Sequence, residues 1–155
     1  MTQDFIIRAL QRDDLTDIRR VLDTSGLFPS EMLADMAEPF LDGASLSSWL
    51  VAIGGGRAVA FAYCEPERMT EGTYNLLAIA VGSDHQRSGV GGALLRHLES
   101  SLRRADGRLL LVETSTDPDQ DGARAFYAGQ DFTEEARIRD FYAPGQTKIV
   151  FWKQL

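Results

Sequence analysis

The sequence contains few of the residues that build disulfide frameworks or metal sites. Its one cysteine, Cys64, cannot form an internal disulfide. The two histidines, His85 and His97, do not combine with this cysteine in the spacing of a metal centre. We therefore expect neither disulfides nor a bound metal.

Long apolar runs are also absent. Stretches such as residues 76–81 have the length of a strand and are too short to cross a bilayer. Residues 1–7 include Asp4 and lack the basic segment and apolar core of a secretory signal. We therefore expect a cytoplasmic protein with no membrane partner.

Basic residues are in the minority. Sixteen Lys and Arg stand against 23 Asp and Glu, for a net charge of -7. Nucleic-acid partners are disfavoured because they select a basic surface. The charge is compatible with a cationic amine substrate, but it is equally compatible with an ordinary acidic protein.

The sequence does contain enough apolar residues for one packed domain. Its 155 residues are 44% hydrophobic, which predicts a single domain over 1–155. Apolar spacing predicts strands at 5–10, 49–53, 58–63, 74–81, 109–113, 132–142 and 148–152, and helices over 14–25, 30–40, 90–105 and 122–129. Asp13 or Asp14 should cap the first helix, and Gly26 should end it.

The order of these elements predicts a mixed α/β sheet. The run 74–81 is almost continuously apolar, which is typical of a central strand covered on both faces. The strand–helix–strand unit over 74–113 should be a right-handed parallel crossover. The hairpins that flank it along the chain should be antiparallel.

The segment Gln86-Arg87-Ser88-Gly89-Val90-Gly91-Gly92 joins the central strand to the next helix. The first turn of a helix has unpaired N–H groups and positive potential, and glycine lets an anion approach the backbone closely. Arg87 adds a cation at the rim. The segment therefore predicts a pyrophosphate site, although a tight turn with glycines for packing alone is the alternative. It has no Gly-Lys-Ser/Thr of a P-loop and no Gly-x-Gly-x-x-Gly dinucleotide fingerprint.

Gln86, Gly89 and Gly91 resemble the acyl-CoA signature of GNAT N-acetyltransferases, Gln/Arg-x-x-Gly-x-Gly/Ala. Residues 123–132 resemble that family's later Ala-x-x-Phe-Tyr…Gly-Phe segment, with Gln130-Asp131 where Gly usually precedes Phe. The resemblance implies an α/β fold with a mixed, mostly antiparallel sheet and helices on both faces. One central parallel strand pair would splay apart to hold acyl-CoA.

The resemblance also implies acetyl-CoA as cosubstrate. Its pyrophosphate would bind the backbone amides of residues 87–92, and its pantetheine arm would bind the main chain of residues 79–81. The cofactor-binding residues expected in this way are Ile79, Ala80, Val81, Gln86, Arg87, Ser88, Gly89, Val90, Gly91, Gly92 and Phe126.

Two residues are candidates for proton transfer. Tyr127 matches the family's tyrosine, and its phenol, with an ordinary pKa of ~10, could donate a proton to the CoA sulfur. Several GNAT enzymes carry Glu early in the central strand, but Asn75 stands there and cannot be a base. Glu113, at the carboxyl end of an apolar strand, is the candidate base. For each residue there is an alternative to a catalytic role. Tyr127 could be an aromatic residue that only packs, and Glu113 could be a solvated residue at a strand end.

The acceptor site is the least determined part. Its candidate residues are Phe28, Glu31, Asn75, Asp140 and Tyr142. We expect an N-acetyltransferase that transfers acetyl from acetyl-CoA to a primary amine of a small molecule or peptide by direct attack in a ternary complex. The alternatives are a non-catalytic acyl-CoA-binding sensor or partner module of the same fold, and a nucleotide-phosphate binder outside the family. A homodimer is compatible with the sequence.

Overall fold

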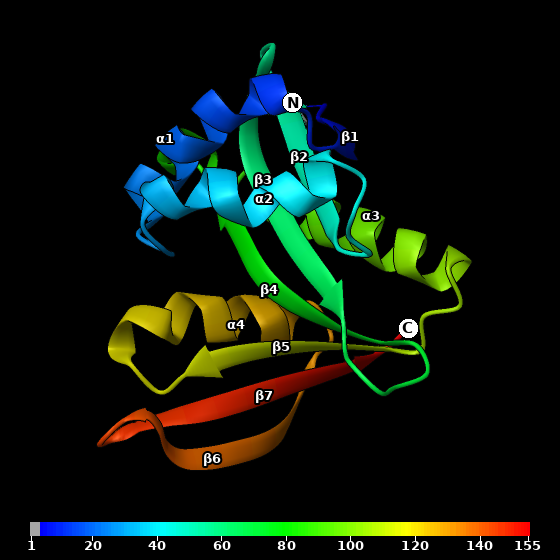
Figure 1. The fold of residues 1–155 in the computed structure, drawn as a ribbon. Helices are drawn as coiled ribbons and strands as arrows, with labels where there is room; N and C mark the ends of the chain where they lie inside the picture. Colours follow the sequence, from blue (N-terminus) through cyan, green and yellow to red (C-terminus); the bar gives the residue numbers. More distant parts are fainter. Residues whose placement is uncertain (1–3) are drawn as a thin grey trace. The chain divides into compact units, whose positions relative to one another are not determined.

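The computed structural model describes residues 4–155, which lie in two compact units. One unit falls within Met1–Glu65 and Leu77–Ser101, and the other comprises Pro66–Leu76 and Leu102–Leu155. The strands are β1 (Ile6–Ala9), β2 (Ser48–Gly54), β3 (Arg57–Pro66), β4 (Thr73–Val81), β5 (Leu109–Ser115), β6 (Thr133–Ala143) and β7 (Gln146–Gln154). The α-helices are α1 (Leu15–Ser25), α2 (Leu33–Leu41), α3 (Val90–Arg104) and α4 (Asp121–Gly129) (Figure 1).

Hydrogen bonds join the strands in the order β1-β2-β3-β4-β5-β7-β6. The β4–β5 pair is parallel, whereas the pairs β1–β2, β2–β3, β5–β7 and β6–β7 are antiparallel. The mixed, mostly antiparallel sheet with one parallel pair is therefore confirmed. Within residues 4–155, none of the four α-helices is long and apolar enough to cross a membrane.

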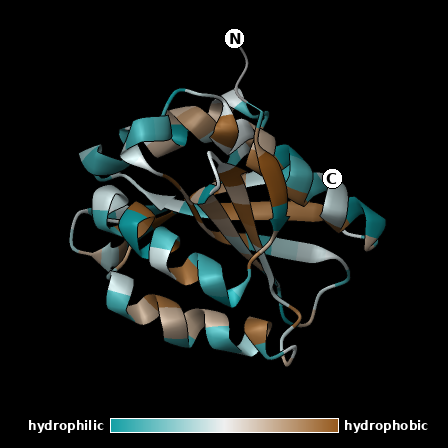
Figure 2. Ribbon diagram, turned by 90° about the horizontal axis from the view of Figure 1, so that it is seen from above, coloured by the Kyte–Doolittle hydropathy of each residue, from teal (hydrophilic) through white to brown (hydrophobic). Residues whose placement is uncertain are grey.

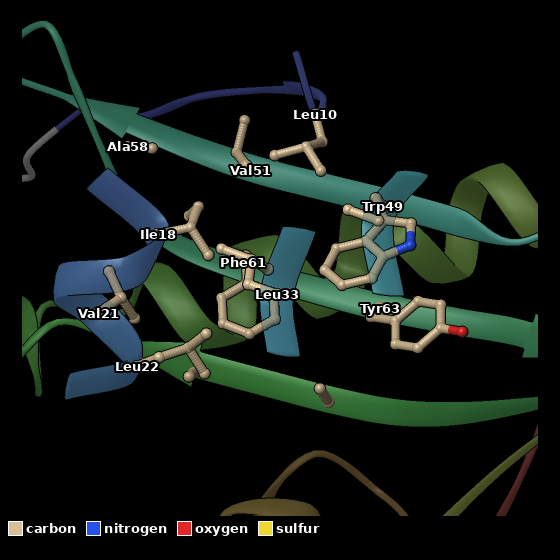
Figure 3. Close-up of a cluster of buried hydrophobic side chains, with 13 residues drawn as sticks. Leu10, Ile18, Val21, Leu22, Leu33, Trp49, Val51, Ala58, Phe61 and Tyr63 are labelled. Carbon is tan, nitrogen blue, oxygen red and sulfur yellow. The ribbon is translucent and has the colours of Figure 1, made fainter. Parts of the chain in front are cut away.

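The first unit has its own apolar core. Ile18 and Leu22 of α1 and Leu33 of α2 pack, fully buried, against the β2–β3 side chains Trp49 and Phe61 (Figure 3). In this unit α1 and α2 cover one face of the strands and α3 covers the other (Figures 1 and 2). Helix amphipathicity explains this layering, because apolar and polar residues alternate along each helix (Figure 2) and apolar side chains such as Val21, Leu33 and Leu94 are buried.

The start of the first helix differs from the prediction. A short 3-10 turn, Arg12–Asp14, precedes α1, and no side-chain cap bond is made by Asp14. Its carboxylate instead accepts hydrogen bonds from the Gln11 N–H at 2.8 Å and from the Arg8 guanidinium at 2.7 and 2.9 Å. The end of α1 at Gly26, with a φ of 65°, is confirmed. The second helix also begins with a 3-10 turn, Ser30–Met32, and becomes α-helical at Leu33.

The second unit is built on β5 and β7. The parallel ladder runs from Thr73↔Leu109 to Leu76↔Val112, after which β4 continues through residues 77–81. The ladder from Leu109↔Gln154 to Ser115↔Lys148 pairs β5 with β7, and the predicted terminal hairpin is formed by β6 and β7. Tyr127 of α4 packs its ring on Phe151 of β7 at 5.8 Å between centroids.

The expected burial of both faces of the central strand is wrong. Ala78 and Ala80 are buried, but Leu77 is 45% exposed and Ile79 and Val81 are only partly buried. Because side chains alternate along a strand, the exposed residues share one face of β4. The apolar run therefore includes an open face, which periodicity alone does not distinguish from a covered one.

Candidate functional site

The segment between β4 and α3 presents unpaired backbone donors. The amide of Ala93 donates to the carbonyl of Gly89 at 3.1 Å, so the N–H groups of Val90, Gly91 and Gly92 precede the intrahelical bonds of α3. Gly89 has a φ of 84°, a left-handed conformation that favours glycine. The turn thereby directs the N-terminal end of a 15-residue helix outward.

The residues before Gly89 extend this group of donors. Arg87 also has a left-handed backbone, with a φ of 64°. Within residues 4–155 the N–H groups of Arg87 and Gly89 donate to no backbone carbonyl, whereas Ser88 is tied to His85 through both its amide and its hydroxyl. Gln86, Arg87, Ser88 and Gly89 are all exposed. Unpaired N–H groups close together beside a guanidinium are suited to binding an anion.

The acidic side chains of the second unit gather around Asn75. The Asn75 amide nitrogen donates to Oε1 of Glu67 at 3.0 Å and to Oε1 of Glu113 at 3.4 Å. The same Glu113 oxygen forms an ion pair with Nζ of Lys148 at 2.8 Å. Asn75 is 6% exposed, and its Oδ1 has no hydrogen-bond partner among the described residues. The cluster thus contains two carboxylates, one internal cation and one unused buried acceptor.

Tyr127 lies in an aromatic environment. Its ring contacts Phe126, Phe132 and Phe151 at centroid distances of 5.4, 5.7 and 5.8 Å. Burial raises the pKa of the hydroxyl above its ordinary value because the phenolate would be poorly solvated. The phenol therefore stays protonated at neutral pH. Its hydroxyl makes no hydrogen bond to any described residue.

Tyr127 and Glu113 lie on opposite faces of the β5–β7 ladder. Val112 pairs with Phe151, so these two side chains share the face on which Tyr127 packs. Glu113 follows Val112 and therefore points to the other face, where Lys148 contacts it. The two proton-transfer candidates are thus separated by one layer of sheet.

The candidate acceptor residues of the second unit differ in character. Asp140, with a φ of 55°, accepts the Gly145 N–H at 2.8 Å and so closes the β6–β7 turn. Tyr142 is 46% exposed and contacts the Phe141 ring at 5.0 Å. Its pKa is raised, first by partial burial and then by the negative charge of Glu113. Tyr142 is therefore near the acidic cluster, whereas Asp140 serves the turn.

The candidate acceptor residues of the first unit line a surface hollow. Phe28 and Glu31 border a space of about 420 Å³ between the end of α1 and the Ser30–Met32 turn. Phe28 also packs edge-on against Phe61 at 6.4 Å, which ties it to the core. Glu31 is exposed.

Sequence reasoning missed Glu67 and Lys148. Nothing in the sequence marks Glu67, because it lies beyond the apolar part of β3 and reaches Asn75 only through the fold. Lys148 could have been found from the β5–β7 register, which places it opposite Ser115 and diagonal to Glu113. Among residues 4–155 no group of three His, Cys, Asp or Glu side chains is placed to hold a metal ion.

Comparisons with known proteins identify the family. The acetyltransferase (GNAT) family profile matches residues 10–132. A GNAT-family protein from Desulfovibrio desulfuricans is 33% identical over 97% of this chain and 98% of its own, with a TM-score of 0.83. A comparison with curated proteins gives no match. The chain therefore belongs to the GNAT acetyltransferase family, which uses acetyl-CoA.

More distant structures share the fold. The ribosomal-protein-S18-alanine N-acetyltransferase of Escherichia coli is 23% identical over 97% of this chain and 94% of its own, with a TM-score of 0.78. YncA of Salmonella typhimurium, solved with acetyl-CoA, is 17% identical over 97% of this chain and 94% of its own, with a TM-score of 0.76. At these identities the likeness concerns the fold and leaves the acceptor open.

Proposed function

We propose that the protein transfers an acetyl group from acetyl-CoA to a primary amine of a small molecule or peptide, by direct attack in a ternary complex. The exposed amides of residues 87–92 and the Arg87 guanidinium bind the pyrophosphate of CoA. The main chain of Ile79, Ala80 and Val81, beyond the four-pair ladder with β5, binds the pantetheine arm as an added strand. The central-strand amides also polarise the thioester carbonyl.

The chemical step divides between Glu113 and Tyr127. Glu113 accepts a proton from the attacking amine, and Tyr127 donates to the departing thiolate. The observation that carries this assignment is the 2.8 Å contact between Oε1 of Glu113 and Nζ of Lys148, in which an amine already lies beside this carboxylate. Burial keeps the Tyr127 phenol protonated, as a proton donor requires.

The acceptor binds as a cation beside the acidic cluster. Glu67 and Glu113 attract an ammonium, and the unpaired Asn75 Oδ1 can accept one of its hydrogens. Phe141 and Tyr142, 50% and 46% exposed, supply apolar contact area next to the charges. In this proposal Asn75 contributes to acceptor binding, in place of the basic role that a glutamate has at its position in several GNAT enzymes.

A non-catalytic acyl-CoA-binding module is the second candidate. It is favoured by Asn75 at the position of the family's glutamate and by the ion pair that already occupies Glu113. A CoA-release assay against a panel of polyamines, amino acids and peptides separates the two candidates. Release that depends on an added amine supports the enzyme. CoA binding without release by any amine in the panel supports the module.

A further inference from the structure

Lysine is unusually scarce in this chain. Fourteen of the 16 basic residues are arginine, which leaves only Lys148 and Lys153, both on β7. Since arginine stays protonated and is a poor nucleophile, only these two side chains carry an amine that can be acylated. They are five positions apart, an odd number, so they point to opposite faces of the strand.

Lys148 lies where the proposed base, Glu113, would require an acceptor amine to be. Any amine that gives its proton directly to Glu113 must come within hydrogen-bond distance of that carboxylate. Nζ of Lys148 lies 2.8 Å from Oε1 of Glu113 and 4.1 Å from the centre of the Phe141 ring. Its side chain is 12% exposed, so these contacts hold the amine within the acidic cluster.

Lys153 has different surroundings. Its Nζ donates to the backbone carbonyl of Gln130 at 2.9 Å and lies 5.6 Å from the centre of the Phe132 ring. It lies on the face of β7 that carries Phe151, away from Glu113. Lys148 is thus an amine beside the proposed base, and Lys153 is a control amine on the same strand that lies away from that base.

We propose that the protein acetylates its own Lys148 from acetyl-CoA, an activity that rests on the proposed function. The ammonium gives one proton to Glu113, and the free amine attacks the thioester carbonyl. The new N–C bond forms and the C–S bond breaks. The nitrogen passes its second proton through solvent to the departing thiolate, and Glu113 then releases its proton to solvent. Overall, lysine ammonium and acetyl-CoA become acetyl-lysine, CoA thiol and one proton.

Acetylation changes the acidic cluster. The amide product carries no positive charge, so the ion pair with Glu113 and the cation–π contact with Phe141 are lost. Glu113 is then left without its internal cation and available to an incoming ammonium. Self-acetylation of Lys148 thus frees the base for external acceptors.

The test is mass spectrometry of the purified full chain incubated with acetyl-CoA, followed by peptide mapping. We expect Lys148 to be acetylated at least about tenfold faster than Lys153, at a rate per molecule that does not depend on protein concentration. Urea-denatured protein should lose this preference. Glu113→Gln should slow the modification of Lys148 by about 10²-fold or more, the usual range for a positioned base. Lys153→Arg should leave it unchanged.

Two results would overturn the inference: equal acetylation of both lysines in the folded protein, or modification of Lys148 that Glu113→Gln does not slow. The proposed function is tested separately by CoA release with external amines. Amine-dependent release from a protein whose Lys148 stays unmodified would reject self-acetylation and retain the enzyme. Failure to bind acetyl-CoA at all would reject the proposed function itself.

Discussion

At the scale of single residues, Tyr127 combines a packing role and a chemical role in separable parts of one side chain. The ring provides the contacts with Phe126, Phe132 and Phe151, whereas the hydroxyl makes no hydrogen bond to any described residue. Removal of the hydroxyl alone therefore isolates the chemical role.

Tyr127→Phe should reduce turnover by about 10²- to 10⁴-fold, the range of a positioned general acid. The Michaelis constant for acetyl-CoA should change little, because the bond to sulfur strengthens only in the transition state. Stability should stay within about 0.5 kcal/mol of the parent because the packing is kept. Steady-state kinetics and the thermal midpoint, measured together, check this. Parent-like turnover would remove Tyr127 from the mechanism.

Glu113→Gln should lower the acetylation rate and leave CoA binding intact. The difference in rate between parent and variant should decrease as pH rises, since more of the acceptor amine is then already deprotonated. Rates of parent and variant over a range of pH provide the measurement. Lys148→Met is the matched control, because it breaks the same ion pair but keeps the carboxylate. An unchanged pH profile in Glu113→Gln would exclude this base.

Asp14 gives the first unit an acid-sensitive contact. Burial tends to raise the pKa of its carboxyl, but hydrogen bonds from Arg8 and Gln11 and the Arg8 charge outweigh burial and lower it. A lowered folded pKa stabilises the protein above the unfolded value of ~3.9, and this stabilisation is lost as pH falls through the folded pKa.

Asp14→Asn should reduce the free energy of unfolding at pH 7 by about 1–3 kcal/mol, as expected for a buried group that loses charged hydrogen bonds. The difference from the parent should narrow below about pH 4, where the carboxyl protonates in the unfolded parent, and should shrink further as pH falls through the lowered pKa of the folded state. Urea unfolding at pH 7 and pH 3 measures both effects. Asp23→Asn, at an exposed position of the same helix, is the control. If the difference in unfolding free energy between parent and Asp14→Asn were the same at pH 7 and pH 3, the lowered pKa of Asp14 would not contribute to stability.

At the scale of elements, most of the fold follows from periodicity and the site follows from register. In the described part of the chain, seven strands and four α-helices lie close to where apolar spacing predicts them, because each has a distinct period and a glycine or polar boundary. The exposed face of β4 was not predictable, since an apolar residue left open for a ligand has the same sequence as a buried one. The 3-10 turns at Arg12–Asp14 and Ser30–Met32 depend on local hydrogen bonds that periodicity does not report.

The candidate site shows the same limit. The donors at the start of α3 could be predicted because Gln86, Gly89 and Gly91 are local in sequence. The acidic cluster could be predicted only in part. Glu113 was found from the end of its apolar run, although the prediction that it ends the strand is wrong because β5 continues to Ser115. Its contacts with Asn75 and Lys148 join residues 38 and 35 positions away, which only strand pairing brings together.

Gly72, in the turn before β4, is the glycine whose substitution should be most costly to the second unit. Its φ is 75°, and an added Cβ would lie 2.8 Å from the Asp106 carbonyl oxygen. Gly72→Ala should cost about 2 kcal/mol or more, since left-handed strain alone costs roughly 1–2 kcal/mol and the backbone contact adds to it. Gly55→Ala has a similar φ of 60° with open space and should show the strain alone. Denaturant unfolding measures both variants. An equal loss of unfolding free energy in Gly72→Ala and Gly55→Ala would contradict a clash between the added Cβ and the Asp106 carbonyl.

At the scale of the whole molecule, CoA binding should be visible as stabilisation. A ligand that binds only the folded state adds about 2.7 kcal/mol at 100 times its dissociation constant. For a chain of this size that corresponds to a rise of roughly 5–10 °C in the unfolding midpoint. Saturating CoA or acetyl-CoA should produce this rise. ATP, which has phosphates but no pantetheine arm, should produce far less.

Gly91→Asp tests whether this stabilisation depends on the start of α3. The added carboxylate would repel the pyrophosphate and occupy the space in which it approaches the backbone. The variant should fold, because an acidic residue in the first turn interacts favourably with the helix dipole. Its midpoint without ligand should therefore stay near that of the parent, while most of the CoA-induced rise should disappear. A folded Gly91→Asp protein with the full rise would show that the pyrophosphate binds elsewhere, and equal rises with ATP and CoA would show that pantetheine is not recognised.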